Sequence, residues 1–294
     1  MSIPCVDPQP RIGIAGLGLI GASLGRAIGD RWPGARRLGF DLDRSVTADA
    51  CVQGVIDEGV DGLPQLLEAC DLLVLCQPVP ALLDSLDRMA CAERLPVMCD
   101  VASVKCVVLA AASRALGARR GRFVGAHPIA GKATSGLAAS DAGLFAGRPV
   151  AVCAEESDPQ AVAWVQTLWE RVGGHVVPMA ASYHDEAYAG LSHLPQLLTW
   201  AYLRSIAGQP WQAQAGLLAG PGFESFTRLG ASSPQLWAGI VMQNRAPILS
   251  ALSHAAEALQ DIRQAVQAGD NDNLITLFNN ARDDLCTISG QPGR

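Results

Sequence analysis

The chain has 294 residues and a formal net charge of −6 at pH 7, so it is long enough for about two domains. Its acidic balance excludes a basic surface for nucleic acid or for an anionic membrane, and we expect small-molecule partners. The nine cysteines are scattered, with no Cys-x-x-Cys pair and no Cys/His cluster at zinc spacing. They predict reduced thiols in a cytoplasmic protein and no bound metal. We expect neither a signal segment nor a membrane span, because no apolar stretch reaches roughly 18 residues.

The first predicted element is an apolar strand that runs directly into a glycine-rich turn. Residues 11–21 read RIGIAGLGLIG, which is a G-x-G-x-x-G between a strand and a helix. The first glycine allows the tight turn, the second lets the backbone approach a pyrophosphate, and the third lets the helix pack on the strand. The amides and the dipole of the helix hold the anion. The predicted dinucleotide-binding residues of this turn are Gly16, Gly18, Leu19, Ile20 and Gly21.

An acidic residue follows the second predicted strand. Residues 37–40 end at Asp41, twenty residues past Gly21, where a carboxylate accepts hydrogen bonds from an adenosine ribose. The alternative, a glycine-rich turn beside a solvated Asp, leaves this spacing unexplained. A carboxylate repels a 2′-phosphate, so we predict NAD as the cofactor. Arg37 and Arg44 are close enough in sequence to bind such a phosphate, and NADP is therefore the alternative.

Short apolar runs alternate with helical patterns up to residue 178. Helices are predicted at 45–53 and 63–69, after Pro80 and from Lys105. Runs that are apolar throughout are typical of strands buried on both faces, so the βα repetition predicts a Rossmann-type doubly wound sheet. The predicted strands after the second are 55–57, 72–76, 97–100, 123–126, 150–153 and 175–177.

Beyond residue 178 the pattern becomes helical only. We place a Rossmann domain at 1–179 and an all-helical domain at 180–294. Pro195 lies inside the first helical pattern, and the last two helices carry apolar stripes. These stripes favour a subunit interface over a self-contained core. The predicted helices are 182–206, 235–244, 247–268 and 272–288, and the stripes are Leu249, Leu252, Ala256, Leu259, Leu274, Leu277 and Phe278.

Candidate site residues follow the strands, because ligands of such a sheet gather outside the carboxyl ends of its strands. Gln77 and Pro78 are predicted to contact the cofactor. His127 can take a proton from a substrate hydroxyl as hydride leaves the same carbon; the alternative is a polar strand end. Ser103 can hydrogen-bond that hydroxyl or the nicotinamide, or cap the next helix. Lys105 is expected to be solvated in a first helical turn.

Several segments together resemble, in order, the prephenate/arogenate dehydrogenases of tyrosine biosynthesis. The glycine run alone fits many dehydrogenases, whereas the His-Pro-Ile-Ala-Gly segment combined with an Arg in the helical part is specific. The resemblance covers residues 11–245. Its segments are GLGLIGAS at 16–23, DVASVK at 100–105, HPIAG at 127–131 with Ser135-Gly136, SHLP at 192–195, and FTRL at 226–229 with Trp237.

The resemblance implies oxidative decarboxylation of a cyclohexadienyl alcohol by a Rossmann domain and a helical substrate-binding domain that forms a homodimer. The product is tyrosine from arogenate, 4-hydroxyphenylpyruvate from prephenate, or both. His127 is then the catalytic base, and Ser103 assists at the hydroxyl. Arg228 binds a substrate carboxylate, although taken alone it suits a surface ion pair, and His193 becomes a pocket residue.

The chain departs from that family at two positions. Gln196 replaces a second His that often follows Ser-His-Leu-Pro, and Ala133 replaces an acidic residue that often follows the His-Pro-Ile-Ala-Gly segment. A neutral Gln196 amide can accept from the ammonium of arogenate, which favours arogenate over prephenate. The alternative is that Gln196 only fills space beside Pro195. Ala133 puts an acidic gate at the pocket mouth in doubt.

Two other functions fit parts of the pattern. A Rossmann dehydrogenase of 2- or 3-hydroxy acids typically needs a Lys on a helix of its second domain, and no Lys follows Lys132 here. A nicotinamide-binding sensor that has lost catalysis is the non-enzymatic alternative. The presence of His127, Ser103 and Arg228 argues against the sensor.

Overall fold

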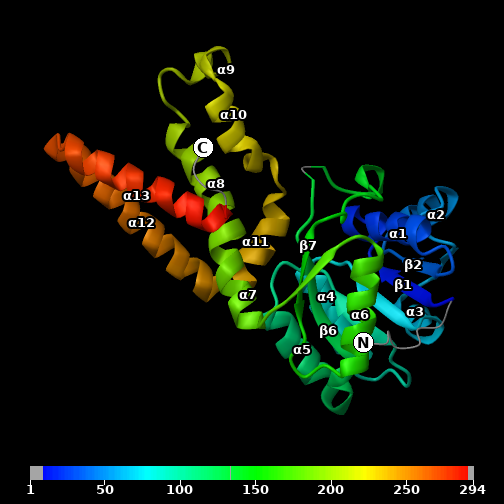
Figure 1. Cartoon of the computed structure of the whole chain (residues 1–294). Helices are drawn as coiled ribbons and strands as arrows, with labels where there is room; N and C mark the ends of the chain where they lie inside the picture. Colours follow the sequence, from blue (N-terminus) through cyan, green and yellow to red (C-terminus); the bar gives the residue numbers. More distant parts are fainter. Residues whose placement is uncertain (1–8, 133, 291–294) are drawn as a thin grey trace. The chain divides into compact units, whose positions relative to one another are not determined.

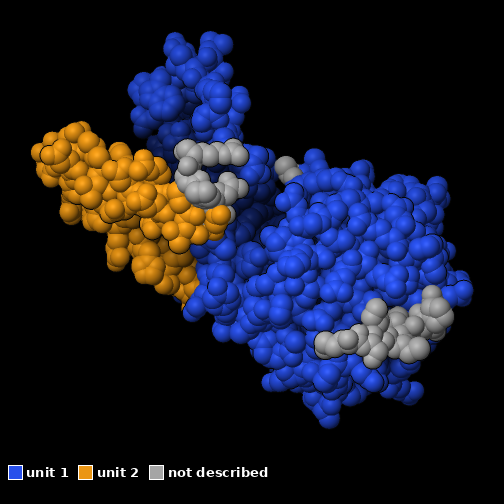
Figure 2. Space-filling model, in the orientation of Figure 1, with its two compact units in different colours: residues 1–245 blue, residues 246–294 orange. Residues whose placement is uncertain are grey.

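The computed structural model describes residues 9–132 and 134–290 and divides into two compact units, residues 1–245 and 246–294 (Figures 1 and 2). Ala133 lies outside the described residues. The first unit holds an eight-stranded sheet, counted over the residues that the structure describes, and the helices up to α11. The strands are β1 (Arg11–Ala15), β2 (Arg36–Phe40), β3 (Glu58–Gly59), β4 (Leu72–Leu75), β5 (Val97–Asp100), β6 (Phe123–Pro128), β7 (Pro149–Cys153) and β8 (His175–Pro178).

In the described part of the chain, α-helices connect consecutive strands except β6 and β7, and they continue alone after β8, as the sequence predicts. Within the described ranges, none of them is long and apolar enough to cross a membrane. They are α1 (Leu19–Arg31), α2 (Arg44–Val52), α3 (Leu63–Ala69), α4 (Val79–Met89), α5 (Cys106–Leu116), α6 (Pro159–Arg171), α7 (Ala181–Tyr188), α8 (Leu194–Ile206), α9 (Ala215–Leu218), α10 (Pro221–Thr227), α11 (Pro234–Gln243), α12 (Arg245–Ala268) and α13 (Asn271–Ser289).

The strand order is β3-β2-β1-β4-β5-β6-β7-β8, and the strands from β3 to β6 pair in parallel. Successive strands are added on one side of β1 up to β3 and on its other side from β4 onwards. The point between β1 and β4 where this change occurs is where a doubly wound sheet binds its ligand. β7 runs antiparallel to β6 and parallel to β8. The predicted doubly wound sheet followed by a helical part is confirmed.

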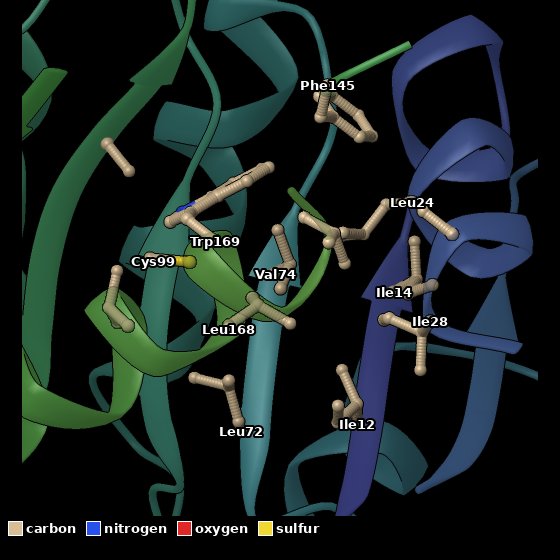
Figure 3. Close-up of a cluster of buried hydrophobic side chains, with 14 of the residues drawn as sticks. Ile12, Ile14, Leu24, Ile28, Leu72, Val74, Cys99, Phe145, Leu168 and Trp169 are labelled. Atoms are coloured by element: carbon tan, nitrogen blue, oxygen red, sulfur yellow. The ribbon is translucent and has the colours of Figure 1, made fainter. Parts of the chain in front are cut away.

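Two apolar cores cover the two faces of the sheet, because successive side chains of a strand point to opposite faces. In β4, Leu72 and Val74 join the core under α1 and α6, whereas Leu73 and Leu75 join the core under α3, α4 and α5. Figure 3 shows the first of these cores, with Trp169 of α6 packed beside Leu168 and near Val74. Full burial of each such side chain contributes roughly 1.5–3 kcal/mol.

Several elements differ from the predicted ones. The short strand predicted at 55–57 lies at β3 instead, because Val55 and Ile56 are buried in the turn after α2 while Glu58 and Gly59 pair with β2. Helices α6, α9 and α10 have no counterpart in the predicted helices. The predicted helix 182–206 is divided by a π-helical turn (Ala189–His193), so Pro195 falls in the first turn of α8, where its missing N–H costs no hydrogen bond.

Candidate active site

The glycine turn between β1 and α1 has the geometry that its spacing predicts. Gly16 has φ 97°, and a Cβ there would lie 2.7 Å from the Cys76 carbonyl oxygen. A Cβ on Gly21 would lie 1.9 Å from the Gly16 carbonyl oxygen, so only glycine lets α1 approach β1 this closely. At Gly18 no atom lies within 4 Å of the added Cβ. The turn is therefore filled at its first and third glycines and open at its second.

The open position coincides with the start of α1. Gly18 is the residue before the helix and no side chain caps it, so the first amides, including those of Leu19 and Ile20, point into this opening unpaired by a cap. A helix of 13 residues adds its positive dipole end at the same place. This cradle fits the pyrophosphate of a dinucleotide, held by backbone alone.

Asp41 directly follows β2 and lies beside the glycine turn. Its Oδ2 accepts from the Leu17 N–H at 2.8 Å and its Oδ1 from the Asp43 N–H at 3.1 Å, so the carboxylate is held at the edge of the cradle. An open cavity of about 420 Å³ adjoins it, lined among others by Leu42 and Arg44. These residues fit the adenosine half of a dinucleotide.

The two arginines that could bind the 2′-phosphate of NADP differ in their contacts. Arg37 is committed to Asp57, with its Nε donating at 3.0 Å, and it also donates to the carbonyl of Gly54. The Arg44 side chain is 86% exposed and lies 3.8 Å from Asp61. Only Arg44 is therefore placed to meet a 2′-phosphate beside Asp41.

Three further predicted residues lie at the carboxyl ends of β4 and β5. Gln77 follows β4 and its Oε1 accepts from the Ser85 hydroxyl at 2.9 Å, and Pro78 directly precedes α4. Ser103 lies half-buried between β5 and α5, and its hydroxyl makes no hydrogen bond with the described residues. The alternative role of Ser103 as a helix cap is not observed, because α5 begins three residues later.

The cap of α5 comes instead from the helical part of the chain. The Asp185 carboxylate of α7 accepts from the Lys105 N–H at 2.7 Å and from the Cys106 N–H at 2.9 Å. A carboxylate that accepts two amides at a helix start satisfies donors that the helix itself leaves unpaired. Asp185 therefore fixes α7 against the edge of the sheet that carries the candidate site.

The prediction that Lys105 is solvated is wrong. Its side chain is fully buried, where its Nζ forms an ion pair with Asp100 at the end of β5 and donates to the Ala126 carbonyl oxygen at 2.8 Å. Asp100 also accepts from the Ala126 N–H at 3.0 Å. This buried pair joins the ends of β5 and β6 immediately before His127.

His127, the predicted base, is half-buried in β6 and starts a chain of hydrogen bonds. Its Nδ1 lies 2.9 Å from Nε2 of the buried His184, and Nδ1 of His184 lies 2.8 Å from Oδ1 of Asp185. The Tyr188 ring packs against both imidazoles, with centroid distances of 5.0 and 4.5 Å. The described residues offer Nε2 of His127 no hydrogen-bond partner.

Electrostatics favour a neutral His127. Burial is the largest cause that holds the pKa of His127 well below its usual value, and the nearby Lys105 ammonium lowers this pKa further. Burial alone would raise the pKa of Asp185, but hydrogen bonds from His184 and from two backbone amides lower it below its usual value. An ionised Asp185 and a neutral His127 are the states that general-base chemistry needs.

His193 belongs to the same network. Its Nδ1 lies 3.1 Å from Nδ2 of the buried Asn244, which also donates to the Asp185 carbonyl oxygen at 2.8 Å. Nε2 of His193 is buried and has no partner among the residues described. The Trp237 ring meets it edge-on at 5.9 Å, and burial lowers the pKa of His193 to about 4.

Gln196 and Arg228 lie further along the helical part. Gln196 is buried in α8, its Nε2 donates to the Leu229 carbonyl oxygen at 2.8 Å, and its Oε1 is left without a partner in the described part of the chain. Arg228 is exposed in a 3₁₀ turn (Arg228–Ala231) and makes no ion pair with the described residues. The structure links Arg228 to Gln196 through its neighbour Leu229 but shows no contact between Arg228 and His127.

Sequence reasoning missed His184, Asp185 and Asn244. The run Ser-Tyr-His-Asp-Glu at 182–186 has the composition of a solvated helix start, and Asn244 follows an apolar helix. One available signal was the unusual pairing of His and Asp in a helix that is otherwise rich in Ala and Leu.

A glycine cradle for a dinucleotide after β1, with a neutral histidine at the end of β6, defines a Rossmann-fold dehydrogenase. The family model for the nucleotide-binding domain of prephenate dehydrogenase matches residues 24–178, and the model for its dimerization domain matches residues 180–280. The chain therefore belongs to the prephenate dehydrogenase family.

Individual relatives agree over most of their length. The cyclohexadienyl dehydrogenase of Zymomonas mobilis is 31% identical over 271 residues, which are 91% of this chain and 92% of that protein. A putative prephenate dehydrogenase from Corynebacterium glutamicum has a solved structure with a TM-score of 0.86 at 29% identity, covering 95% of this chain and 89% of that one. The arogenate dehydrogenase structure from Synechocystis gives 0.80 at 28% identity, covering 95% and 99%.

Proposed function

We propose that this chain is an NAD(P)-dependent dehydrogenase that oxidatively decarboxylates arogenate to tyrosine, prephenate to 4-hydroxyphenylpyruvate, or both. The observation that carries the proposal is His127, which burial keeps neutral at a strand end and which is hydrogen-bonded through the buried His184 to the Asp185 carboxylate. Its position in a member of the prephenate dehydrogenase family supports this substrate class.

Each residue of the candidate site has its own role in this reaction. The bound cofactor supplies a hydride acceptor, and the glycine turn and Asp41 hold it by pyrophosphate and ribose. His127 accepts the proton of the ring hydroxyl, and Ser103 donates to the same oxygen. Loss of proton and hydride turns the alcohol carbon into a ketone; the ring carboxylate then leaves as carbon dioxide, and the electrons of the broken bond make the ring aromatic and its oxygen a phenolate, which takes back the proton from His127. Arg228 binds a carboxylate of the substrate through its planar fork of donors.

Gln196 supports arogenate as the preferred substrate. Its amide nitrogen is used by the Leu229 carbonyl, so the group left for a ligand is the buried Oε1, an acceptor. An acceptor suits the ammonium of arogenate, whereas the prephenate ketone offers no hydrogen to it. One charge-assisted hydrogen bond gives about 1.5–3 kcal/mol of preference.

Cofactor reduction measured with both substrates tests the function. We expect a higher kcat/KM for arogenate in the wild type and improved prephenate use in Gln196→His, with Gln235→His as a control on α11. A wild type that prefers prephenate contradicts the role of Gln196. Reduction with 2- or 3-hydroxy acids in place of both substrates would instead support the alternative enzyme, and cofactor binding without any turnover would support the sensor.

The assembly proposed with this function is a homodimer through the helical part. The match to a dimerization domain supports it, and so do the exposed apolar side chains of α12 and α13, among them Leu259 and Phe278. The eight cysteines in the described part of the chain are all unpaired, which supports a reducing, cytoplasmic location.

A further inference from the structure

The buried Asp185 connects to both histidines of the site through one intermediate residue each. Its carboxylate reaches His127 through His184, and its backbone carbonyl reaches His193 through Asn244. Both intermediates are almost completely buried. Because each link has a fixed donor or acceptor, the positions of the ring hydrogens can be worked out along the network.

The first branch determines which nitrogen of His127 carries its hydrogen. An ionised carboxylate only accepts, so Nδ1 of His184 donates to Asp185. Nε2 of a neutral His184 then has a lone pair and accepts, so Nδ1 of His127 must be the donor across the 2.9 Å contact. Nε2 of His127 is left with its lone pair.

The second branch works in the opposite sense. A backbone carbonyl only accepts, so the Asn244 amide must present Nδ2, not Oδ1, to Asp185. The same Nδ2 lies against Nδ1 of His193 and donates to it, so Nδ1 is the acceptor nitrogen of that ring. The hydrogen of neutral His193 is therefore on the buried, unpartnered Nε2.

We propose that Asp185, acting through His184 and Asn244 as positioning residues, holds His127 and His193 in opposite tautomers. His127 presents an acceptor at Nε2 and His193 presents a donor at Nε2. The buried Asp185 thus makes Nε2 of His127 a proton acceptor for a hydroxyl group and Nε2 of His193 a hydrogen-bond donor for a ligand oxygen. The assignment of the two tautomers does not depend on the proposed function, whereas their use in turnover rests on it.

The tautomers are read directly by NMR of enzyme labelled with nitrogen-15 in its histidines. The chain has five histidines, and single substitutions assign them. We expect the hydrogen of His127 on Nδ1 and that of His193 on Nε2. A His127 with its hydrogen on Nε2, or a His193 with its hydrogen on Nδ1, overturns the proposal.

Two substitutions of His184 separate positioning from packing. The amide of His184→Gln reaches the place of Nε2 and can still accept from His127, whereas the shorter amide of His184→Asn reaches only the place of Nδ1, towards Asp185. We expect His184→Asn to lower kcat by about 10- to 100-fold with little change in KM, and His184→Gln to retain most of it. In the spectra, His127 keeps its Nδ1 hydrogen in His184→Gln and loses that preference in His184→Asn.

Asn244→Leu tests the second branch, since leucine fills similar space without a donor. The hydrogen of His193 should lose its preference for Nε2 while His127 is unchanged, and the substrate KM should rise by about 10-fold, the range of one lost hydrogen bond. Equal losses of kcat in His184→Asn and His184→Gln, with both tautomers unchanged, would show that His184 and Asn244 support the fold only and do not position the two histidines. If neither arogenate nor prephenate is turned over, the proposed function fails and the spectra still decide the tautomers.

Discussion

At the scale of single residues, we expect turnover to depend most on His127. An asparagine there can hold the substrate hydroxyl but cannot take its proton, so we expect His127→Asn to lower kcat by about 10²- to 10⁴-fold while NAD binding is retained. Steady-state kinetics and a fluorescence titration of the nucleotide measure the two effects. His175→Asn, at an exposed position in β8, is the control. Near-normal turnover in His127→Asn would remove this residue from the mechanism.

The same residue determines the expected pH dependence. A histidine acting as a general base must be neutral, and the pKa of His127 lies well below its usual value because of burial and the nearby Lys105 ammonium. We therefore expect kcat/KM to rise with pH only in the acidic range and to be constant through neutral pH. A rise of kcat/KM with its midpoint at or above about pH 6.5, the ordinary pKa of histidine, contradicts this expectation.

We expect Asp41 to control the choice between NAD and NADP. Its carboxylate accepts from ribose hydroxyls and repels a 2′-phosphate, so the wild type should prefer NAD. Asp41→Asn should shift the ratio of kcat/KM for NAD and NADP by about 10- to 100-fold towards NADP, with Arg44 exposed beside it. Asp49→Asn makes the same charge change at an exposed position of α2. A wild type that prefers NADP contradicts the role given to Asp41.

Arg228 is suited to a clean test of substrate binding, because it is exposed and makes no ion pair within the described residues. Arg228→Ala should raise KM for the cyclohexadienyl substrate far more than KM for the nucleotide, since a carboxylate loses a partner that contributes about 1.5–3 kcal/mol. Arg204→Ala, exposed on α8, is the control. Equal increases in the two KM values would assign Arg228 to the fold.

At the scale of elements, Lys105 joins the ends of β5 and β6 to α5 and α7. Lys105→Met leaves Asp100 buried without its cation, so we expect a loss of about 3–5 kcal/mol in the free energy of unfolding, measured in urea. The chain's other lysine provides a matched control: Lys132 forms a partly exposed pair with Asp141, and Lys132→Met should cost at most about 1 kcal/mol. Similar losses in both variants would show that the buried pair adds little.

At the scale of the whole molecule, the apolar surface of α12 and α13 predicts association. Leu259 is 60% exposed and Phe278 is 56% exposed, which is unusual for side chains of this size unless a partner covers them. Leu259→Glu should shift the enzyme from dimer to monomer in analytical ultracentrifugation, whereas Gln260→Glu, the same charge on the next residue, should not. A monomeric wild type contradicts the homodimer.

The sequence by itself determined the features that depend on local spacing. The glycine turn and Asp41 follow from a strand, a turn and a helix of fixed lengths, and His127 and Ser103 follow from their places after apolar strands. These are short-range relations, so one stretch of chain specifies each of them. The apolar runs likewise identified seven of the eight described strands at their observed positions, with shifts of one or two residues at their ends.

Only the tertiary structure decided how those residues are supported. Asp185 caps a helix that begins 79 residues earlier in the chain, His184 meets His127 across 57 residues, and Lys105 is buried because β5, β6 and α7 close around it. Hydrophobic spacing specifies which face of an element is buried but not which distant polar groups meet there. Burial removes water as a partner, so each of these groups has to find another group of the protein.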